Sequence, residues 1–162
     1  LIYNDKMYYV IQNGIYTCDL GGEGKQCVMK EREIKEIFLG TFDAIDNRLY
    51  FLAENLDNKI CVYYISISSF RLSEVVCEDV SCYALGEKGI YYVSEDDGNV
   101  YYKTYQNSES IEKTAIENCS NSLLKYGNNG WLIQEQKSVS DGQIYAFNEV
   151  KGVSKILFKS NR

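Results

Sequence analysis

The feature that most constrains the fold is an internal repeat with a period of about 41 residues. Short apolar runs, three of them opened by aromatic pairs, begin at residues 7, 49, 90 and 131, which gives intervals of 42, 41 and 41 residues. The runs are Met7-Tyr8-Tyr9-Val10, Leu49-Tyr50-Phe51-Leu52, Ile90-Tyr91-Tyr92-Val93 and Trp131-Leu132-Ile133-Gln134. A fixed period of this length indicates a repeat architecture in which each repeat is one supersecondary unit.

Turn-forming residues stand at two fixed places in every repeat. The turns before the runs are Asn4-Asp5-Lys6, Asp46-Asn47-Arg48, Glu87-Lys88-Gly89 and Asn128-Asn129-Gly130. The turns after the runs are Asn13-Gly14, Asn58-Lys59, Asp97-Gly98 and Asp141-Gly142. Asn-Gly and Asp-Gly favour two-residue hairpin loops, because Asn, Asp and Gly tolerate the positive φ that both central residues require. We therefore predict at least one tight hairpin in each repeat.

Further β-rich runs complete each repeat. One run follows the hairpin, at residues 25–29, 72–76, 111–116 and 153–158. Another run leads into the turn of the next repeat, at residues 37–44, 80–85 and 122–126, and residues 1–3 are what remains of this run at the start of the chain. Four strands of about 5 or 6 residues and four connections of about 4 add up to roughly 40 residues. Each repeat is therefore predicted to be a four-stranded antiparallel meander, and the charged segment 30–37 a loop or strand extension rather than a helix.

Such a sheet has two apolar faces and cannot bury both alone. Radial stacking of four-stranded sheets gives a β-propeller, so we predict an all-β propeller of four blades over residues 1–36, 37–79, 80–121 and 122–162. The chain has 15 Tyr and no Pro, which suits strands throughout. Aromatic residues repeated at one place in every blade are interpreted as packing between blades rather than as a ligand platform.

The number of blades is open between two alternatives. Four blades close into a compact propeller, or the chain is a fragment of a larger one. The short first strand, Leu1-Ile2-Tyr3, and the absence of an initiating Met favour a fragment. An open fragment leaves apolar faces on its terminal blades, so we expect self-association through them.

Composition narrows the chemistry. The chain is 45% hydrophobic and 25% charged, as in ordinary globular proteins, and has no apolar run of the roughly 20 residues that would cross a bilayer. It contains no His, which excludes Ser-His-Asp and Cys-His nucleophile systems and His-ligated metal sites. We predict no cofactor and no metal. The remaining enzymatic alternative is carboxylate chemistry on a glycosidic bond, with Asp43 and Asp46 as candidate pair.

The six cysteines do not recur at one place in the repeat. Two pairs are close enough in sequence to form disulfides, namely Cys18 with Cys27 and Cys77 with Cys82. Because no position is shared by all four repeats, the sequence favours free thiols in apolar surroundings.

The charges gather on predicted loops. If the strand before each apolar run is innermost, the loops on one face of the disc carry eleven acidic and five basic residues, a balance equal to the formal net charge of −6. Such a face attracts cationic partners and repels nucleic acid and anionic membranes. The predicted binding residues are Glu54, Asp57, Glu78, Asp79, Glu95, Asp96 and Asp97. The cluster Glu95-Asp96-Asp97 lacks the alternating spacing of a calcium loop, which favours a structural turn.

The runs resemble a known propeller family. Met7-Tyr8-Tyr9-Val10, followed by the segment 14–22 (Gly-Ile-Tyr-Thr-Cys-Asp-Leu-Gly-Gly), is similar to the Tyr-Trp-Thr-Asp repeats of low-density-lipoprotein-receptor-type propellers and to bacterial propeller domains of unknown function. Where the receptor motif has Asp, this chain has Ile11, Ala53, Ser94 and Gln134, so that family's Asp network and ligands do not carry over. The resemblance implies an extracellular or cell-envelope interaction module without catalytic activity.

These observations lead to a ranked set of functions. We expect a non-enzymatic propeller whose acidic loops bind a protein or glycan partner, without nucleic-acid binding or membrane insertion. The alternatives are a carboxylate-dependent glycan hydrolase with its site at the propeller axis and a purely architectural repeat module.

Overall fold

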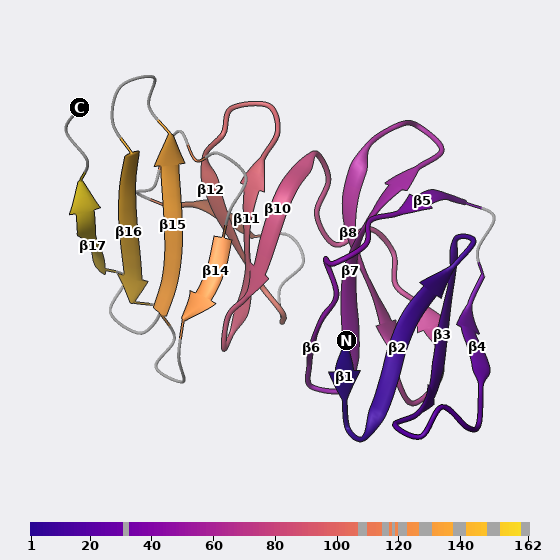
Figure 1. Cartoon of the computed structure of the whole chain (residues 1–162). Helices are drawn as coiled ribbons and strands as arrows, with labels where there is room; N and C mark the ends of the chain where they lie inside the picture. Colours follow the sequence, from indigo (N-terminus) through magenta and orange to yellow (C-terminus); the bar gives the residue numbers. More distant parts are fainter. Residues whose placement is uncertain are drawn as a thin grey trace. The chain divides into compact units, whose positions relative to one another are not determined.

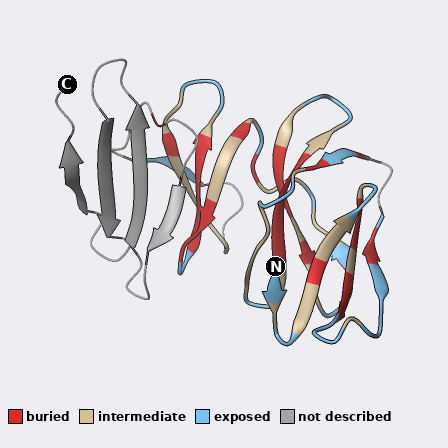
Figure 2. Ribbon diagram, viewed as in Figure 1, coloured by how far each residue is buried: buried red, intermediate tan, exposed pale blue. Residues whose placement is uncertain are grey.

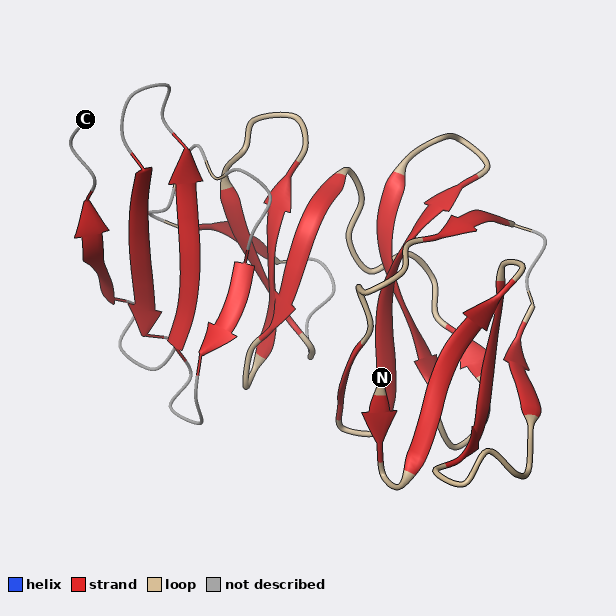
Figure 3. Ribbon diagram, in the orientation of Figure 1, coloured by secondary structure: helices blue, strands red, loops and turns tan. Residues whose placement is uncertain are grey.

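Every repeated run becomes a central strand of an antiparallel sheet in the computed structural model (Figure 1). The structure describes residues 1–30, 33–106, 110–114, 117 and 119, together with the backbone of strands in 123–126, 131–137, 142–148 and 153–159. Among these residues every element is a strand, as Figure 3 shows, and none is a helix that could cross a membrane. The prediction of an all-β chain of antiparallel sheets is confirmed.

The chain divides into two compact units, residues 1–78 and 79–162. The first unit begins with the first sheet, in which β1 (Ile2–Tyr3), β2 (Lys6–Ile11), β3 (Gly14–Asp19) and β4 (Gln26–Met29) lie in chain order. Its second sheet consists of β5 (Ile34–Ile37), β6 (Asp43–Ile45), β7 (Arg48–Asn55), β8 (Ile60–Ser66) and β9 (Arg71–Leu72).

The second unit also contains two antiparallel sheets. The third sheet of the chain has β10 (Val80–Leu85), β11 (Gly89–Ser94), β12 (Val100–Thr104) and β13 (Ile111–Lys113) in chain order. The fourth sheet has β14 (Leu123–Tyr126), β15 (Trp131–Lys137), β16 (Gly142–Asn148) and β17 (Val153–Lys159). The predicted turns at residues 128–130 and 141 lie outside the described residues.

Among the described residues, three two-residue loops have positive φ at both positions, the conformation that a tight hairpin requires. They are Asn4-Asp5 (49° and 58°), Gln12-Asn13 (46° and 58°) and Asp46-Asn47 (49° and 62°). The hairpin predicted at Asn13-Gly14 is therefore wrong by one residue. Gly14 is instead the first residue of β3, where a Cβ would stand 2.9 Å from the Cε2 atom of Tyr16 and 3.3 Å from the carbonyl oxygen of Ile11.

The hairpin predicted at Asp97-Gly98 is also wrong in length. The connection between β11 and β12 runs from residue 95 to 99, and within it only Gly98 has positive φ (65°). Hydrogen bonds to the side chains of Ser94 and Asp97 hold this longer loop.

The second sheet departs most from the predicted meander. The run 37–44 is not one strand, because β5 pairs with the end of β7 and β6 with its beginning. Thr41 lies in the gap, where its hydroxyl accepts the N–H of Leu52 at 3.0 Å and donates to the carbonyl of Phe38 at 2.8 Å. The run 72–76 is likewise shortened to β9, after which Cys77 forms an isolated bridge with Val62.

The core of the first unit lies between its two sheets. Tyr8, Ile15 and Val28 of the first sheet belong to one buried cluster that continues into the second sheet through eight residues. These are Ile34, Ile37, Leu49, Phe51, Ala53, Cys61, Tyr63 and Ile65. Figure 2 shows β7 buried along most of its length. Tyr8 of β2 and Phe51 of β7 therefore pack sheet against sheet, as the sequence predicted, whereas their neighbours Tyr9 and Tyr50 lie outside this cluster.

All six cysteines are free thiols. The register explains why Cys18 and Cys27 are not bridged. Cys27 of β4 lies opposite Tyr16 of β3, and Cys18 is two residues further along β3. The two cysteines are thus offset by two positions on neighbouring strands, which is too far for ordinary disulfide geometry.

Candidate functional site

The seven predicted acidic residues divide between the two units. Glu54, Asp57 and Glu78 belong to the first unit, and Asp79, Glu95, Asp96 and Asp97 belong to the second. Glu54 lies near the end of β7 and Asp57 in the loop after it, Glu78 and Asp79 lie in the link between β9 and β10, and Glu95, Asp96 and Asp97 lie in the loop after β11.

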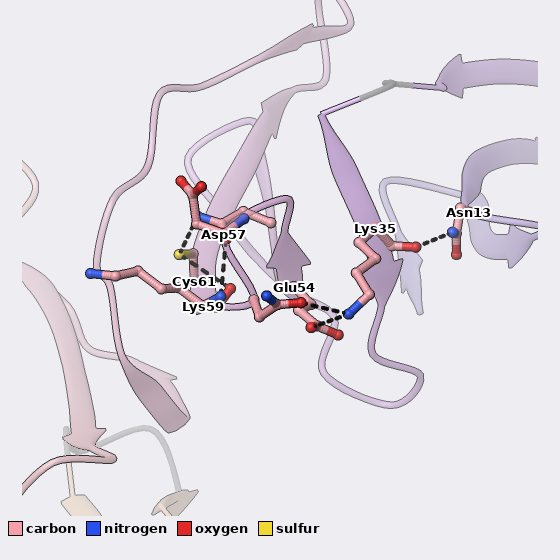
Figure 4. Close-up of polar contacts among 8 residues, drawn as sticks. Asn13, Lys35, Glu54, Asp57, Lys59 and Cys61 are labelled. Carbon is pink, nitrogen blue, oxygen red and sulfur yellow. Dashed lines mark hydrogen bonds and ion pairs between the residues drawn. The ribbon is translucent and has the colours of Figure 1, made fainter.

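In the first unit, Glu54 is tied into the sheet. Lys35 of β5 donates from Nζ to Glu54 Oε1 at 2.6 Å and to Asn58 Oδ1 at 2.9 Å (Figure 4). The backbone carbonyl of Lys35 in turn accepts a hydrogen bond from the Asn13 side chain of the first sheet. Glu54 is only 18% exposed. Its charge is therefore matched by Lys35, which joins β5 to β7 through Glu54 and to the loop between β7 and β8 through Asn58.

Glu78 and Asp57 are more open. Lys59 Nζ lies 3.0 Å from Glu78 Oε2, and their side chains are 42% and 52% exposed. An exposed ion pair of this kind contributes about 0–1 kcal/mol. Asp57 is exposed in a loop shaped by Asn55, whose Oδ1 accepts the N–H groups of Asp57 at 2.9 Å and Lys59 at 3.0 Å.

In the second unit, Asp97 organises its own loop. Its carboxylate accepts hydrogen bonds from the Asn99 backbone N–H at 3.0 Å, the Asn99 side-chain amide at 2.7 Å and the Tyr101 hydroxyl at 2.8 Å. These bonds, led by the backbone N–H of Asn99, lower the pKa of Asp97 to about 2. The same carboxylate raises the pKa of Tyr101. Asp97 is thus ionised at neutral pH and committed to the turn.

The loop is fastened at three further points. Ser94 accepts the Asp96 N–H on its hydroxyl at 3.2 Å and the Gly98 N–H on its carbonyl at 3.0 Å. The Gly98 carbonyl accepts the N–H of Cys119 at 2.6 Å. The Glu95 N–H donates to the carbonyl of Asp79 at 2.8 Å, which brings the half-buried Asp79 beside the loop. Glu95 and Asp96 are exposed.

A basic residue lies on the neighbouring strand. Lys113 of β13 pairs with Glu117 at 3.0 Å, and this hydrogen bond is the main cause of the raised pKa of Lys113, to which Asp97 contributes less. The lysine is therefore engaged by another carboxylate. The group made of Asp79, Glu95, Asp96 and Asp97, called the acidic loop below, keeps its negative charge.

The loop has a structural rather than a metal-binding geometry. Within the described part of the chain no group of three or more His, Cys, Asp or Glu residues is placed to hold a metal ion. The oxygens of Asp97 are instead occupied by hydrogen bonds within the turn.

The catalytic alternative does not gain support from the geometry of Asp43 and Asp46. Asp43 Oδ1 accepts the N–H of Ala44 at 2.8 Å, and the exposed Asp46 belongs to a two-residue loop with φ of 49°. A depression of about 520 Å³ lies elsewhere, on the first sheet, and its lining contains no carboxylate.

Sequence reasoning did not single out that depression. Its lining residues are Met7, Tyr9, Ile11, Tyr16, Cys18, Gly22, Lys25 and Cys27. The alternation of Met7, Tyr9 and Ile11 along β2 was the available signal, since residues two apart in a strand point to the same side.

Comparison with known proteins shows the fold. No family model and no curated protein matches the chain. An oligogalacturonate lyase solved in complex with manganese aligns with 97% of this chain and 51% of its own, at 12% identity and a TM-score of 0.72. A nidogen/laminin complex aligns with 98% of this chain and 60% of the matched chain, at 9% identity and a TM-score of 0.61.

TolB from Acinetobacter baumannii gives a similar result. The alignment covers 96% of this chain and 41% of the TolB chain, at 14% identity and a TM-score of 0.64. These neighbours are β-propellers, and the likeness supports a propeller fold for this chain. The chain spans between 41% and 60% of the length of these three structures.

Proposed function

We propose that this propeller is a non-enzymatic binding module that engages a basic segment of a partner protein through the acidic loop. The observation that carries the proposal is the hydrogen-bonded turn around Asp97, which fixes the backbone that presents the exposed Glu95 and Asp96. A loop that is already ordered loses little conformational entropy on binding. Clustered carboxylates favour a cationic partner over a neutral glycan, because a neutral glycan gains nothing from the field of the loop.

One of the comparisons favours a binding role. One neighbour was solved as part of a nidogen/laminin complex, so a related fold takes part in a protein complex there. The rival proposal is a carboxylate-dependent glycan hydrolase with Asp43 and Asp46, and the lyase neighbour does not favour it, because a lyase cleaves by elimination rather than by hydrolysis. Two carboxyl groups about 5–10 Å apart in one pocket would be required for glycoside hydrolysis.

The proposal extends to the architecture and the setting of the chain. We infer that the four sheets are consecutive blades, either closed as four or belonging to a larger propeller, and that the module acts outside the cell or at a bacterial cell envelope. Support comes from the common plan of the sheets and from the sequence resemblance to receptor-type propellers.

The test is a charge-neutralising double substitution, Glu95→Gln with Asp96→Asn. Binding of a fluorescent oligolysine peptide is measured by anisotropy at low and at physiological salt. Each exposed charge is worth about 0.2–1 kcal/mol, so we expect the variant, which removes both charges, to bind about two- to thirtyfold more weakly at low salt. The difference should shrink as salt screens the charges.

The matched control is Asp5→Asn with Glu87→Gln, which makes the same charge change at exposed residues that do not belong to the acidic loop. It should leave peptide affinity near that of the unaltered chain. An equal loss in both double variants would mean that only the overall charge matters, and it would contradict the proposal.

A further inference from the structure

Three sulfur-containing side chains line one depression on the first sheet. Met7 of β2, Cys18 of β3 and Cys27 of β4 all belong to the lining of the depression of about 520 Å³. Their three strands are neighbours in the sheet, as Figure 1 shows. The group is therefore built by a single sheet of the first unit.

The strand register sets the spacing of the sulfurs. Met7 lies directly opposite Cys18, where Cβ atoms are about 4.5–5.5 Å apart. Cys27 lies opposite Tyr16, so it is a diagonal neighbour of Cys18 at about 7–8 Å. A disulfide needs Cβ atoms about 3.8 Å apart and does not reach across this diagonal. A metal ion about 2.3 Å from each sulfur holds the two sulfurs roughly 4–5 Å apart, and so it spans the diagonal.

The surroundings of the sulfurs are largely apolar. Cys18 is 2% exposed, and the half-buried rings of Tyr9 and Tyr16 stack in the same lining with centroids 6.0 Å apart. Burial raises the pKa of the Tyr9 hydroxyl and the Cys18 thiol raises it further, which places the two groups close together. Cys27 is exposed. The group thus combines one sulfur that solvent reaches with one in apolar surroundings.

We propose that Met7, Cys18 and Cys27 form a binding site for a soft monovalent metal ion, Cu(I). Thiolate and thioether sulfurs select Cu(I), whereas Mg²⁺ and Ca²⁺ take oxygen ligands. A structural Zn²⁺ site is almost always a tetrahedron of four ligands, and the residues that line the depression include no His, Asp or Glu to complete one.

The charge of the lining also favours a monovalent ion. Each thiol releases its proton to solvent when its sulfur binds the metal, so two thiolates and Cu(I) together carry one negative charge. Lys25 lies in the same lining and supplies one positive charge. A divalent ion with two thiolates is neutral and gains nothing from this lysine.

The site does not follow a short sequence motif. Met7 and Cys18 are 11 residues apart, and Cys18 and Cys27 are 9 residues apart. Within the described residues no three His, Cys, Asp or Glu side chains are placed to hold a metal, so a methionine completes the pair of cysteines here. The antiparallel register, which brings residues from three strands together, therefore creates the group.

Anaerobic titration of Cu(I) against a chromophoric Cu(I) chelator tests this inference. The unaltered chain should take one Cu(I) from the chelator. Cys27→Ser should weaken binding at least about hundredfold, because losing a ligand costs more than losing an outer-shell partner, which costs about 10–100-fold. Met7→Leu should give a smaller loss, since a thioether carries no charge. Cys27 is exposed, so its substitution leaves the core of the first unit intact.

The matched controls are Cys82→Ser and Met29→Leu. They make the same changes at a half-buried cysteine of the third sheet and at a methionine of β4, neither of which lines the depression. Both variants should keep the Cu(I) affinity of the unaltered chain.

X-ray absorption at the copper edge gives a second readout. It should show a first shell of sulfur alone at about 2.3 Å, with fewer sulfurs in Cys27→Ser. Failure to take Cu(I) from the chelator, equal weakening by Cys27→Ser and Cys82→Ser, or nitrogen or oxygen in the first shell of the unaltered chain would each overturn the proposal.

Discussion

The first and second sheets carry the same aromatic pair in the same place, yet they surround it differently. Phe51 of the second sheet is 0% exposed, whereas Tyr9, its counterpart in the first sheet, is half-buried. The stacking geometry of the two pairs is nearly identical. Local sequence therefore sets how the rings stack within a sheet, and the next sheet in the fold decides how much energy their burial contributes.

The largest effect that tests this comparison is the removal of each ring. We expect Phe51→Ala to lower the free energy of unfolding by about 3–5 kcal/mol, because it leaves a cavity between two sheets. Tyr9→Ala should cost about 1–2 kcal/mol, because water already reaches that ring. Urea denaturation at low protein concentration measures both, and equal losses would contradict the comparison.

A smaller effect concerns the broken edge of the second sheet. Thr41→Val removes the hydroxyl that accepts the Leu52 N–H and donates to the Phe38 carbonyl, leaving both backbone groups without that partner. We expect a loss of about 1–3 kcal/mol in unfolding free energy. Thr41→Ser keeps the hydroxyl and should retain most of the stability. A neutral Thr41→Val would mean that water replaces the hydroxyl.

The smallest effect is a pH dependence confined to the loop of the third sheet. The pKa of Asp97 is lowered from 3.8 to about 2 in the folded chain. Its contribution to stability is therefore complete above about pH 3.8 and is lost as pH falls toward 2. Melting curves of Asp97→Asn should differ most from the unaltered chain above pH 3.8 and converge near pH 2.

The control for this measurement is Asp96→Asn, the same change at the adjacent residue, whose backbone N–H bonds to Ser94. This variant keeps the Asp97 carboxylate and its three hydrogen bonds, so the loss of stability that accompanies protonation of Asp97 should persist in it. If Asp97→Asn melts in parallel with the unaltered chain at every pH, the three hydrogen bonds to the carboxylate do not stabilise the loop.

Much of the secondary structure followed from local chemistry. The turns at Asn4-Asp5 and Asp46-Asn47 were predictable because Asn and Asp tolerate the positive φ found there. The Asn13-Gly14 turn was misplaced by one residue because Gly14 is required by crowding against Tyr16 rather than by its own φ. The need for glycine at position 14 depends on where the Tyr16 ring lies in the folded chain.

The acidic residues were less predictable as a site. Their positions at or near loops were predictable from the repeat, but the lysines that pair with two of them were not. Lys35 is 19 residues from Glu54 in sequence, and Lys59 is 19 residues from Glu78. These ion pairs form because neighbouring strands bring distant residues together, which loop composition alone does not reveal.

The sequence by itself determined the repeat, the antiparallel hairpins and the aromatic residues of the central strands, because strand alternation and turn conformation depend on neighbouring residues. Only the tertiary structure decided that Phe51 is buried while Tyr9 stays half-open, that Thr41 spans a broken edge, and that Asp97 is committed to its own turn. Burial and hydrogen bonding at these places depend on which sheet or loop lies opposite, and that is a property of the folded chain.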